Sequence, residues 1–237
     1  MAYGFLALGQ SGRVQIDETY KNARLFTSGY ANTQEFFGQR YPISVPIPDN
    51  VDAPLVLLRP SAPEVWVGAV RTRPRMSTGG SASVNMEGTG PFYYAIFDTN
   101  ISPISDGNSF GLRVLTSSGA ETFSSNYRYP RISSIHYKPA SSALGSGWPV
   151  NSPYIYTISG HTFMPWILGN TLVGNNGEGV GDDTEQVPCA YATINSTFTQ
   201  LKVAKWNQEG AGARNDTVLW NPYGNRDTYF GVARYVE

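Results

Sequence analysis

The sequence predicts an all-β protein of two related β-sandwich-like halves, built around a repeated N-terminal hairpin. Three observations support this fold class. The chain of 237 residues contains 25 Gly, 16 Pro, 11 Phe and 15 Tyr but only 15% charged residues, a composition that favours strands and tight turns over helices. No long window shows sustained helical periodicity. A stretch at residues 3–25 returns, in diverged form, at residues 110–132.

The repeat aligns without a gap at an offset of 107 residues. Identical residues occupy the aligned positions Gly4/Gly111, Leu8/Leu115, Ser11/Ser118, Gly12/Gly119, Tyr20/Tyr127 and Arg24/Arg131. In each copy, alternate apolar residues fall on one face of a strand, and a polar link then ends in glycine. Glycine tolerates the positive φ that a short hairpin loop requires. We therefore expect hairpins at 3–17 and 110–124 in equivalent positions, although Val14 is replaced by Glu121 in the return strand.

The two halves are expected to form an N-terminal β domain at 1–103 and a C-terminal β domain at 108–237. A turn-rich linker at 101–109 separates them. The second half is longer, which predicts expanded loops at 140–190. Because both halves begin and end alike, one continuous sandwich is the alternative to two domains.

Short apolar runs mark further strands. LVLLRP at 55–60 ends at Pro60, and PFYYAIFDTN at 91–100 is rich in aromatic residues. TVLWNP at 217–222 resembles the first run, and TYFGVARYVE at 228–237 resembles the second. These similarities extend the predicted repeat beyond the hairpins.

The charge pattern argues against two classes of partner. A net charge of -1 gives no basic footprint for nucleic acid or an anionic membrane. No run approaches the roughly 20 apolar residues that span a bilayer, and the N-terminus lacks a signal-peptide pattern. We expect neither nucleic-acid binding nor membrane insertion, and no export by a recognisable signal.

The sequence shows no recognisable catalytic or metal-binding pattern. His136 and His161 have no partner at metal or triad spacing. Cys189 has no nucleophile signature around it and is interpreted as a buried thiol, the usual state of a free cysteine. Two distant carboxylates would suffice for glycoside hydrolysis, but nothing selects such a pair. The acidic cluster at 178–185 fits a solvated turn better than a calcium site; it consists of Glu178, Asp182, Asp183 and Glu185. We predict no enzymatic activity, no metal and no cofactor.

An aromatic segment within the expanded region supplies the candidate binding residues. They are Trp148, Tyr154, Tyr156, His161, Phe163 and Trp166. Aromatic side chains on loops are common binding anchors. The competing interpretation, favoured for 154–158, is a strand with alternate rings buried. For Trp148 and for the run HTFMPW at 161–166, which Pro165 prevents from being a clean central strand, core and surface positions are equally expected. We place function in 140–190 because added loops are where β scaffolds usually bind.

Three strings resemble a group of bacteriophage minor virion proteins of the tail-tip or tail-fibre type. They are YGFLALGQSGRVQID at the N-terminus, FYYAIFD at 92–98 and FGLRVLTSSG at 110–119. The resemblance covers the two hairpins and the middle strand but not 140–227. It implies an all-β virion component, made in the host cytoplasm and assembled near the end of the particle that meets the host.

Two functions from different classes follow. The first is attachment, to other phage tail proteins and to a host surface glycan or pilus. The second is hydrolysis of surface polysaccharide, which would require two carboxylates about 5 to 9.5 Å apart in a cleft. We expect the first. A β protein with few charges has limited means of protecting its sheet edges, so we also expect a homo-oligomer, and the resemblance to tail fibres favours a trimer.

Overall fold

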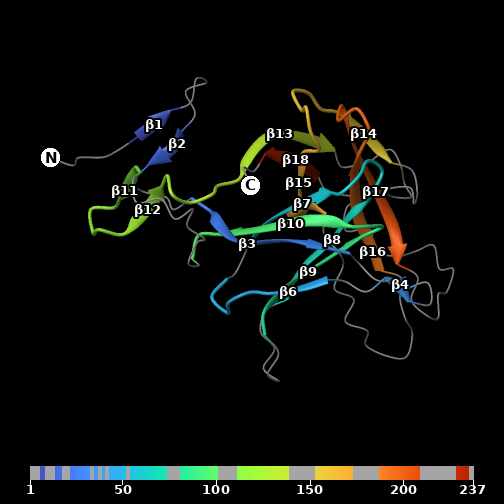
Figure 1. Cartoon of the computed structure of the whole chain (residues 1–237), viewed down its shortest axis with the longest axis horizontal. Coiled ribbons are helices and arrows are strands. Elements are labelled where there is room, and N and C mark those ends of the chain that lie inside the picture. The colour runs from blue at the N-terminus through green and yellow to red at the C-terminus, as the bar shows by residue number, and fades with distance from the viewer. Residues whose placement is uncertain are drawn as a thin grey trace.

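The computed structural model describes residues 6–8, 14–17, 22–32, 35–36, 39–40, 43–51, 54–73, 81–100, 111–138, 153–172, 187–208 and 228–234 (Figure 1). Strands and turns make up these ranges, apart from one short 3-10 helix, η1 (Gly169–Thr171). The predicted all-β fold class is therefore confirmed. Within the same ranges, no helix is long and apolar enough to cross a membrane.

Two six-stranded antiparallel sheets form the body of the molecule. The first has the order β13-β18-β15-β7-β10-β3 and the second β14-β17-β16-β8-β9-β6. The first sheet consists of β3 (Arg24–Ala31), β7 (Leu55–Pro60), β10 (Phe92–Asp98), β13 (Arg131–Lys138), β15 (Trp166–Leu168) and β18 (Thr228–Arg234). The second consists of β6 (Ile43–Pro46), β8 (Val67–Arg73), β9 (Ser83–Gly88), β14 (Tyr154–Thr157), β16 (Val187–Ile194) and β17 (Gln200–Gln208).

The main hydrophobic core contains side chains from both sheets, as expected for a sandwich. In β7, Val56 and Leu58 belong to this core, whereas Leu57 belongs to a second cluster on the other face of the first sheet. That cluster consists of Leu25, Leu57, Ala95, Phe97, Trp166 and Ala233. Because β7 is buried on both faces, its sequence is a continuous apolar run rather than an alternating one.

Each sheet contains three strands from residues 1–103 and three from 108–237. The two sets meet at the centre of each sheet. In the first sheet β7 pairs with β15, with Leu57 opposite Leu168. In the second sheet β8 pairs with β16, with Gly68 opposite Tyr191. Residues from both predicted halves therefore contribute strands to each of the two sheets.

Asn170 extends the central pairing of the first sheet beyond the end of β15. Its side-chain Nδ2 donates a hydrogen bond to the carbonyl of Pro54 at 2.6 Å, and its Oδ1 accepts one from the N–H of Val56 at 2.6 Å. Gly169 allows the close approach, since a Cβ there would lie 3.1 Å from the carbonyl oxygen of Val56. The amide of Asn170 thus takes the place of a backbone neighbour for β7.

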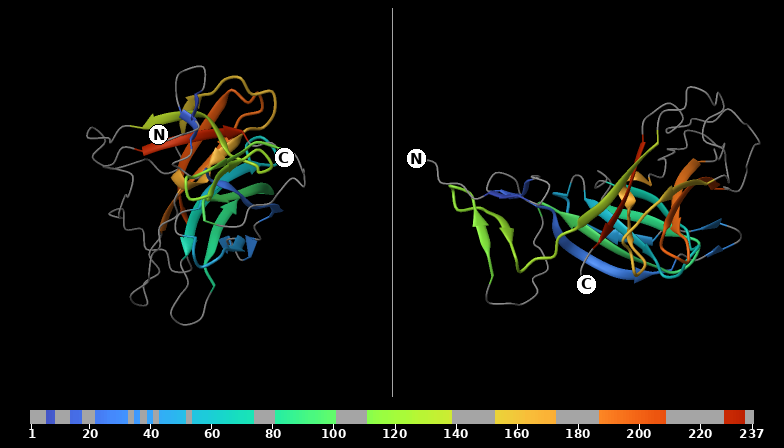
Figure 2. Two further views of the ribbon diagram at one scale, coloured as in Figure 1. Left: turned by 90° about the vertical axis from the view of Figure 1, so that its left-hand side faces the viewer. Right: turned by 90° about the horizontal axis from the view of Figure 1, so that it is seen from above.

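Both predicted hairpins are present, as β1 (Leu6–Leu8) with β2 (Val14–Asp17) and β11 (Arg113–Leu115) with β12 (Glu121–Ser124). Gly119 has a φ of 85°, the conformation expected of the loop glycine. The hairpins lie at one end of the molecule, beyond the sandwich and near the start of β3 (Figures 1 and 2). A short further pair joins β4 (Glu35–Phe36) to β5 (Gln39–Arg40).

Several sequence expectations can be placed on this fold. The runs at 55–60 and 91–100 form β7 and β10, as predicted. The linker at 101–109 and the run at 217–222 lie outside the described residues. The described parts of the region 140–190 are residues 153–172 and 187–190, which contain β14, β15 and the start of β16; these strands are members of the two sheets.

Candidate interaction surface

The aromatic residues selected from the sequence occupy very different environments. Tyr154 and Tyr156 lie on β14, half-buried against the main core, while Ile155 between them is 55% exposed. This is the alternating strand that the sequence favoured. Phe163 is 53% exposed, and His161 is partly buried. Trp148 lies outside the described residues.

Trp166 is in the core, because only 1% of its surface is exposed. It therefore cannot act as an exposed binding anchor, one of the two roles considered for it. Arg59 lies over its ring with Cζ 4.8 Å from the centroid, and the same guanidinium lies 4.5 Å from the ring of Tyr93. Tyr93 meets Tyr30 edge to face at 5.1 Å. These side chains form a row across four strands on the outer face of the first sheet.

The row of Tyr30, Tyr93, Arg59 and Trp166 depends on strand register. Tyr30 is paired with Tyr93, and Tyr93 with Arg59, in adjacent strands. Aromatic and cation–π contacts of this kind stabilise a sheet and hold the rings in fixed orientations. Tyr30 ends the row and is 58% exposed. The sequence could not reveal this row, since its members are separated by tens of residues.

A second cluster lies where the edge strands β13 and β14 face one another. The rings of His136 and Tyr156 are 5.3 Å apart, and that of Phe230 is 6.0 Å from Tyr156. Burial raises the pKa of Tyr156 to about 12, and nearby Tyr154 adds to the shift. Burial also lowers the pKa of His136, which favours its neutral form.

Ser134 forms a hydrogen bond of 3.0 Å with Nε2 of His136. A serine–histidine pair becomes a nucleophile only when a further group orients the imidazole and donors stabilise an oxyanion. The recorded ring contact of His136 is instead with Tyr156, a packing arrangement. We therefore assign this pair a structural role.

Exposed apolar side chains gather on β13, an outermost strand of the first sheet. Ile132, Ile135 and Tyr137 are 47%, 58% and 49% exposed, and we call these three residues the β13 edge. The preceding hairpin exposes Leu112 and Leu115 as well. A sheet edge with exposed apolar residues is a template for pairing with another chain. The sequence pattern of this strand did not predict the exposure of these side chains, because that exposure follows from the outermost position of β13 in the sheet.

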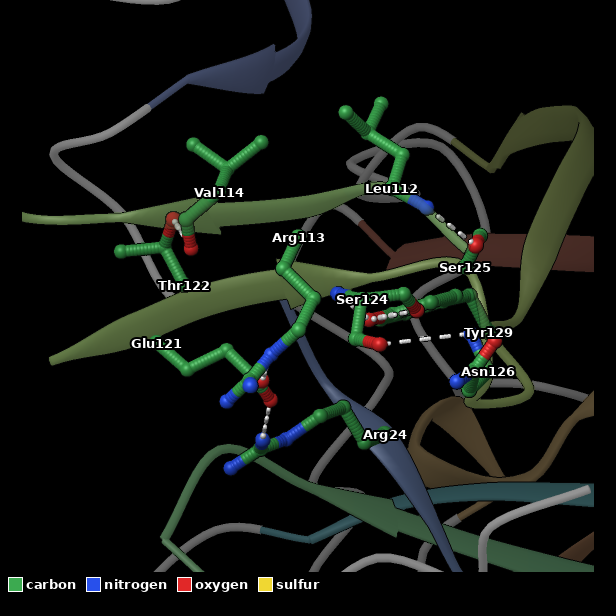
Figure 3. Close-up of polar contacts among 10 residues, drawn as sticks. All are labelled: Arg24, Leu112, Arg113, Val114, Glu121, Thr122, Ser124, Ser125, Asn126 and Tyr129. Atoms are coloured by element: carbon green, nitrogen blue, oxygen red, sulfur yellow. Dashed lines mark hydrogen bonds and ion pairs between the residues drawn. The ribbon is translucent and has the colours of Figure 1, made fainter. Parts of the chain in front are cut away.

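An ion network fastens the β11–β12 hairpin to the sandwich (Figure 3). Arg24 of β3 and Arg113 of β11 both donate to the carboxylate of Glu121, at 3.2 Å and 2.7 Å. The side chains of Arg24 and Glu121 are only 11% and 13% exposed. The N–H of Leu25 also donates to the carbonyl of Arg128 at 2.9 Å. Glu121 thus has a specific role that the Val14 of the first hairpin could not fulfil.

Tyr129 organises the end of the same hairpin. Its hydroxyl donates to the carbonyl of Ser124 and accepts from the N–H of Ser124, both at 2.8 Å. Its ring stacks on Phe123 with centroids 4.9 Å apart. Burial raises the pKa of Tyr129, so the hydroxyl remains a hydrogen-bond donor. These contacts give the hairpin a fixed shape.

The buried carboxylates of the described region serve as structural acceptors. Glu87 is 1% exposed and accepts a hydrogen bond of 2.7 Å from the hydroxyl of Tyr191. Gly68 lies between them in register, opposite Glu87 on one side and Tyr191 on the other. Asp98 accepts from the N–H of Asn100 at 2.6 Å.

Within the described ranges, no group of three or more His, Cys, Asp or Glu side chains could hold a metal ion. The acidic cluster at 178–185 lies outside those ranges. Cys189 lies in β16, opposite Trp206 in β17. Comparison with known proteins found no matching family model, no matching curated protein and no matching solved structure.

The raised pKa of Tyr156 predicts a loss of stability at high pH. Below pH 10.0 the phenol is protonated in both the folded and the unfolded chain. Between pH 10 and about 12 the unfolded chain releases this proton while the folded chain retains it, so the free energy of unfolding falls as pH rises. Tyr156→Phe should flatten this fall, measured by urea unfolding across that range. An unchanged pH dependence in the variant would contradict the assignment.

Replacing the carboxylate of Glu121 should loosen the hairpin. Glu121→Gln keeps the shape but removes the charge that two arginines share, so we expect a loss of about 1–3 kcal/mol in the free energy of unfolding. Hydrogen exchange should accelerate in 113–124. Glu64→Gln is the matched control, since the Glu64–Lys202 ion pair of 2.7 Å is more exposed and should cost less than about 1 kcal/mol. Equal losses in the two variants would argue against the fastening role.

Proposed function

We propose that this chain is a structural component of a phage tail tip or tail fibre and attaches to its neighbours through the β13 edge and the β11–β12 hairpin. The exposed apolar side chains of that edge are the main observation in favour. The resemblance of both hairpins and of the strand at 92–98 to phage minor virion proteins supplies the setting. The chain would then be located on the virion.

The physical argument concerns the outermost strand. Ile132, Ile135 and Tyr137 are about half exposed in one strand, and covering such side chains is worth about 25 cal/mol per Å² of apolar surface removed from water. Edge pairing would add backbone hydrogen bonds to this term. A second copy of the chain or another tail protein could supply the covering surface. We favour a homo-oligomer, and the tail-fibre resemblance favours a trimer.

Contact with the host is assigned to the aromatic segment. Phe163 is the exposed ring among its described members. Trp148 is retained as a candidate from the sequence, whereas Trp166 is set aside because it is buried. A host glycan or pilus is the partner that this proposal implies, since exposed rings can stack on sugars or enter a protein pocket.

Attachment is favoured over the alternative, a virion-associated polysaccharide hydrolase. Glycoside hydrolysis needs two carboxyl groups facing a substrate. The buried or nearly buried acids of the described ranges are already engaged: Glu87 with Tyr191, Asp98 with a backbone N–H, and Glu121 with two arginines. Turnover of host surface polysaccharide by the purified chain would reverse this preference.

The virion assignment has a direct test. Antibodies against the chain, labelled with gold and applied to particles produced by the genome that encodes it, should bind at the end of the tail. Particles from which the gene has been deleted are the control. Labelling elsewhere on the particle would refute the assignment. So would the absence of labelling together with the absence of the chain from purified particles in mass spectrometry.

The β13 edge has a separate test with a matched control. Ile135→Lys places a charge on the proposed interface and should weaken self-association or incorporation into particles at least tenfold. Ile155→Lys makes the same change on β14, at nearly the same exposure of 55% against 58%, and should have no effect. Light scattering of the purified chain and quantification in particles measure the two outcomes. Equal behaviour of the two variants would remove the β13 edge from the proposal.

A further inference from the structure

We infer that the whole chain is a tandem duplication of one hairpin-plus-six-strand module, folded as a dimer within a single chain. The first module contains β1–β2, β3 and β6–β10, and the second contains β11–β12 and β13–β18. Along each module the six strands alternate between the sheets in the same way: first, second, first, second, second, first. This goes beyond the repeated hairpins and is independent of the virion assignment.

The lateral order of the strands is also the same. In the first sheet the order β3-β10-β7 of one module corresponds to β13-β18-β15 of the other. In the second sheet β6-β9-β8 corresponds to β14-β17-β16. Many arrangements of six strands in two sheets exist, so agreement in both sheets at once argues for a common origin.

The hairpins agree at the level of single residues. Leu6 is opposite Asp17 and Arg113 is opposite Ser124, which are the same positions at the 107-residue offset. The register shifts between residues 7 and 8 in one hairpin and between residues 114 and 115 in the other. A β-bulge is a specific local feature that is kept within families, so its recurrence at equivalent positions supports duplication.

A second bulge recurs in the first sheet. Between β3 and β10 the register skips Phe26, and between β13 and β18 it skips Ser133, again 107 residues later. Beyond the bulge Tyr30 is opposite Tyr93, and Tyr137 is opposite Tyr229. A pair of opposed tyrosines therefore occurs at equivalent positions of both modules, although most neighbouring residues differ.

The structural register corrects the alignment of the last strand. The sequence comparison matched 228–237 with 91–100, which places Thr228 on Pro91. In the first sheet Thr228 is opposite Lys138 and Phe92 is opposite Ala31, and Ala31 and Lys138 are equivalent at the 107-residue offset. The residue equivalent to Thr228 is therefore Phe92, one position after Pro91. Likewise β15, rather than the run at 217–222, occupies the place of β7.

Contacts between the modules have the pattern of a two-fold axis. In a symmetric antiparallel pair, the central residue lies opposite its own equivalent. Matching β6 to β14 from their first residues makes Met86 in β9 equivalent to Val203 in β17, so Glu87 is equivalent to Ala204. Gly68 is opposite Glu87 and Tyr191 is opposite Ala204, which makes Gly68 and Tyr191 equivalent. Gly68 and Tyr191 also pair with each other.

The first sheet shows the same pattern. Leu57 is opposite Ala95 in β10, and Leu168 lies beside Gly231 in β18, where its Cβ is 3.1 Å from the Cβ position of that glycine. Leu57 and Leu168 pair with each other. In each sheet, the central pair thus has the register of a local two-fold axis between the modules.

Duplication means that the chain presents one type of edge twice. Tyr30 on β3 and Tyr137 on β13 are equivalent and are 58% and 49% exposed. A partner that recognises the edge strand carrying this tyrosine thus has two related sites per chain, one on β3 and one on β13, at the opposite edges of the first sheet. The partner class that fits is one with two copies of the same recognised element.

Circular permutation tests the modular organisation in a chain that keeps every residue. One permutant opens the chain between Asn100 and Gly111 and joins residue 237 to residue 1 with a flexible glycine–serine linker. It exchanges the order of two equivalent modules. The control uses the same linker but opens the chain at the β9–β10 turn, between Thr89 and Gly90, inside the first module.

The expected result is a single cooperative urea transition with the parent midpoint and slope for the first permutant, and a clearly lower midpoint for the control. Equal loss in both permutants, or a larger loss in the first, would overturn the modular inference. Failure of both to fold counts as equal loss. The readout is conformational stability, so it does not depend on whether the chain belongs to a virion.

Discussion

The pairing of β7 with β15 and of β8 with β16 is the constraint on which the remaining structure depends. Each pair lies at the centre of a six-stranded sheet, so the outer strands can add to a sheet only where the central ones exist. Val67 and Ala192 from one pair, and Leu58 and Ile167 from the other, all belong to the main core. Separation of the modules would therefore open both sheets and expose that core at once.

Polar side chains reinforce these central pairs where backbone pairing is short. β15 has three residues, yet Asn170 continues its contact with β7 through two hydrogen bonds. On the second sheet, the hydroxyl of Tyr191 reaches Glu87 across Gly68. Breaking the Asn170 contact would remove a hydrogen bond from the N–H of Val56 and from the carbonyl of Pro54, and the loss of a hydrogen bond is costly in a low-dielectric interior. The polar contacts thus add to the register that the buried apolar side chains already favour.

The sequence predicted the elements with strong local signals. The apolar run of β7, the aromatic run of β10 and the glycine-closed hairpin at Gly119 needed no information from distant residues. The sheet order could not be predicted, because it depends on contacts such as Leu57 with Leu168 across more than a hundred residues. β15 has only three residues and follows Pro165, so no local pattern marked it as a strand.

The candidate surface shows the same limit. The alternation of Tyr154 and Tyr156 was readable, since a strand places alternate residues on one face. The burial of Trp166 was not, because the apolar cluster that contains it and the Arg59 side chain over its ring come from distant parts of the chain. The exposure of Ile135 follows from the outermost place of β13, which no local pattern specifies. Glu121 appeared as a mismatch in the repeat and proved to be the acceptor for two arginines.

The separation of Leu57 from Leu168 along the chain also has a consequence for folding during synthesis. A ribosome adds about 5–20 residues per second, so Leu168, which is 111 positions after Leu57, is added roughly 6–22 s later. Throughout that interval the inner edges of β7 and β8 lack their partners, and closing so long a loop carries an entropic cost before any contact forms. During this interval the nascent first module has unpaired sheet edges at β7 and β8. On a polysome that carries many identical chains, these edges can pair with β7 or β8 of a neighbouring nascent chain.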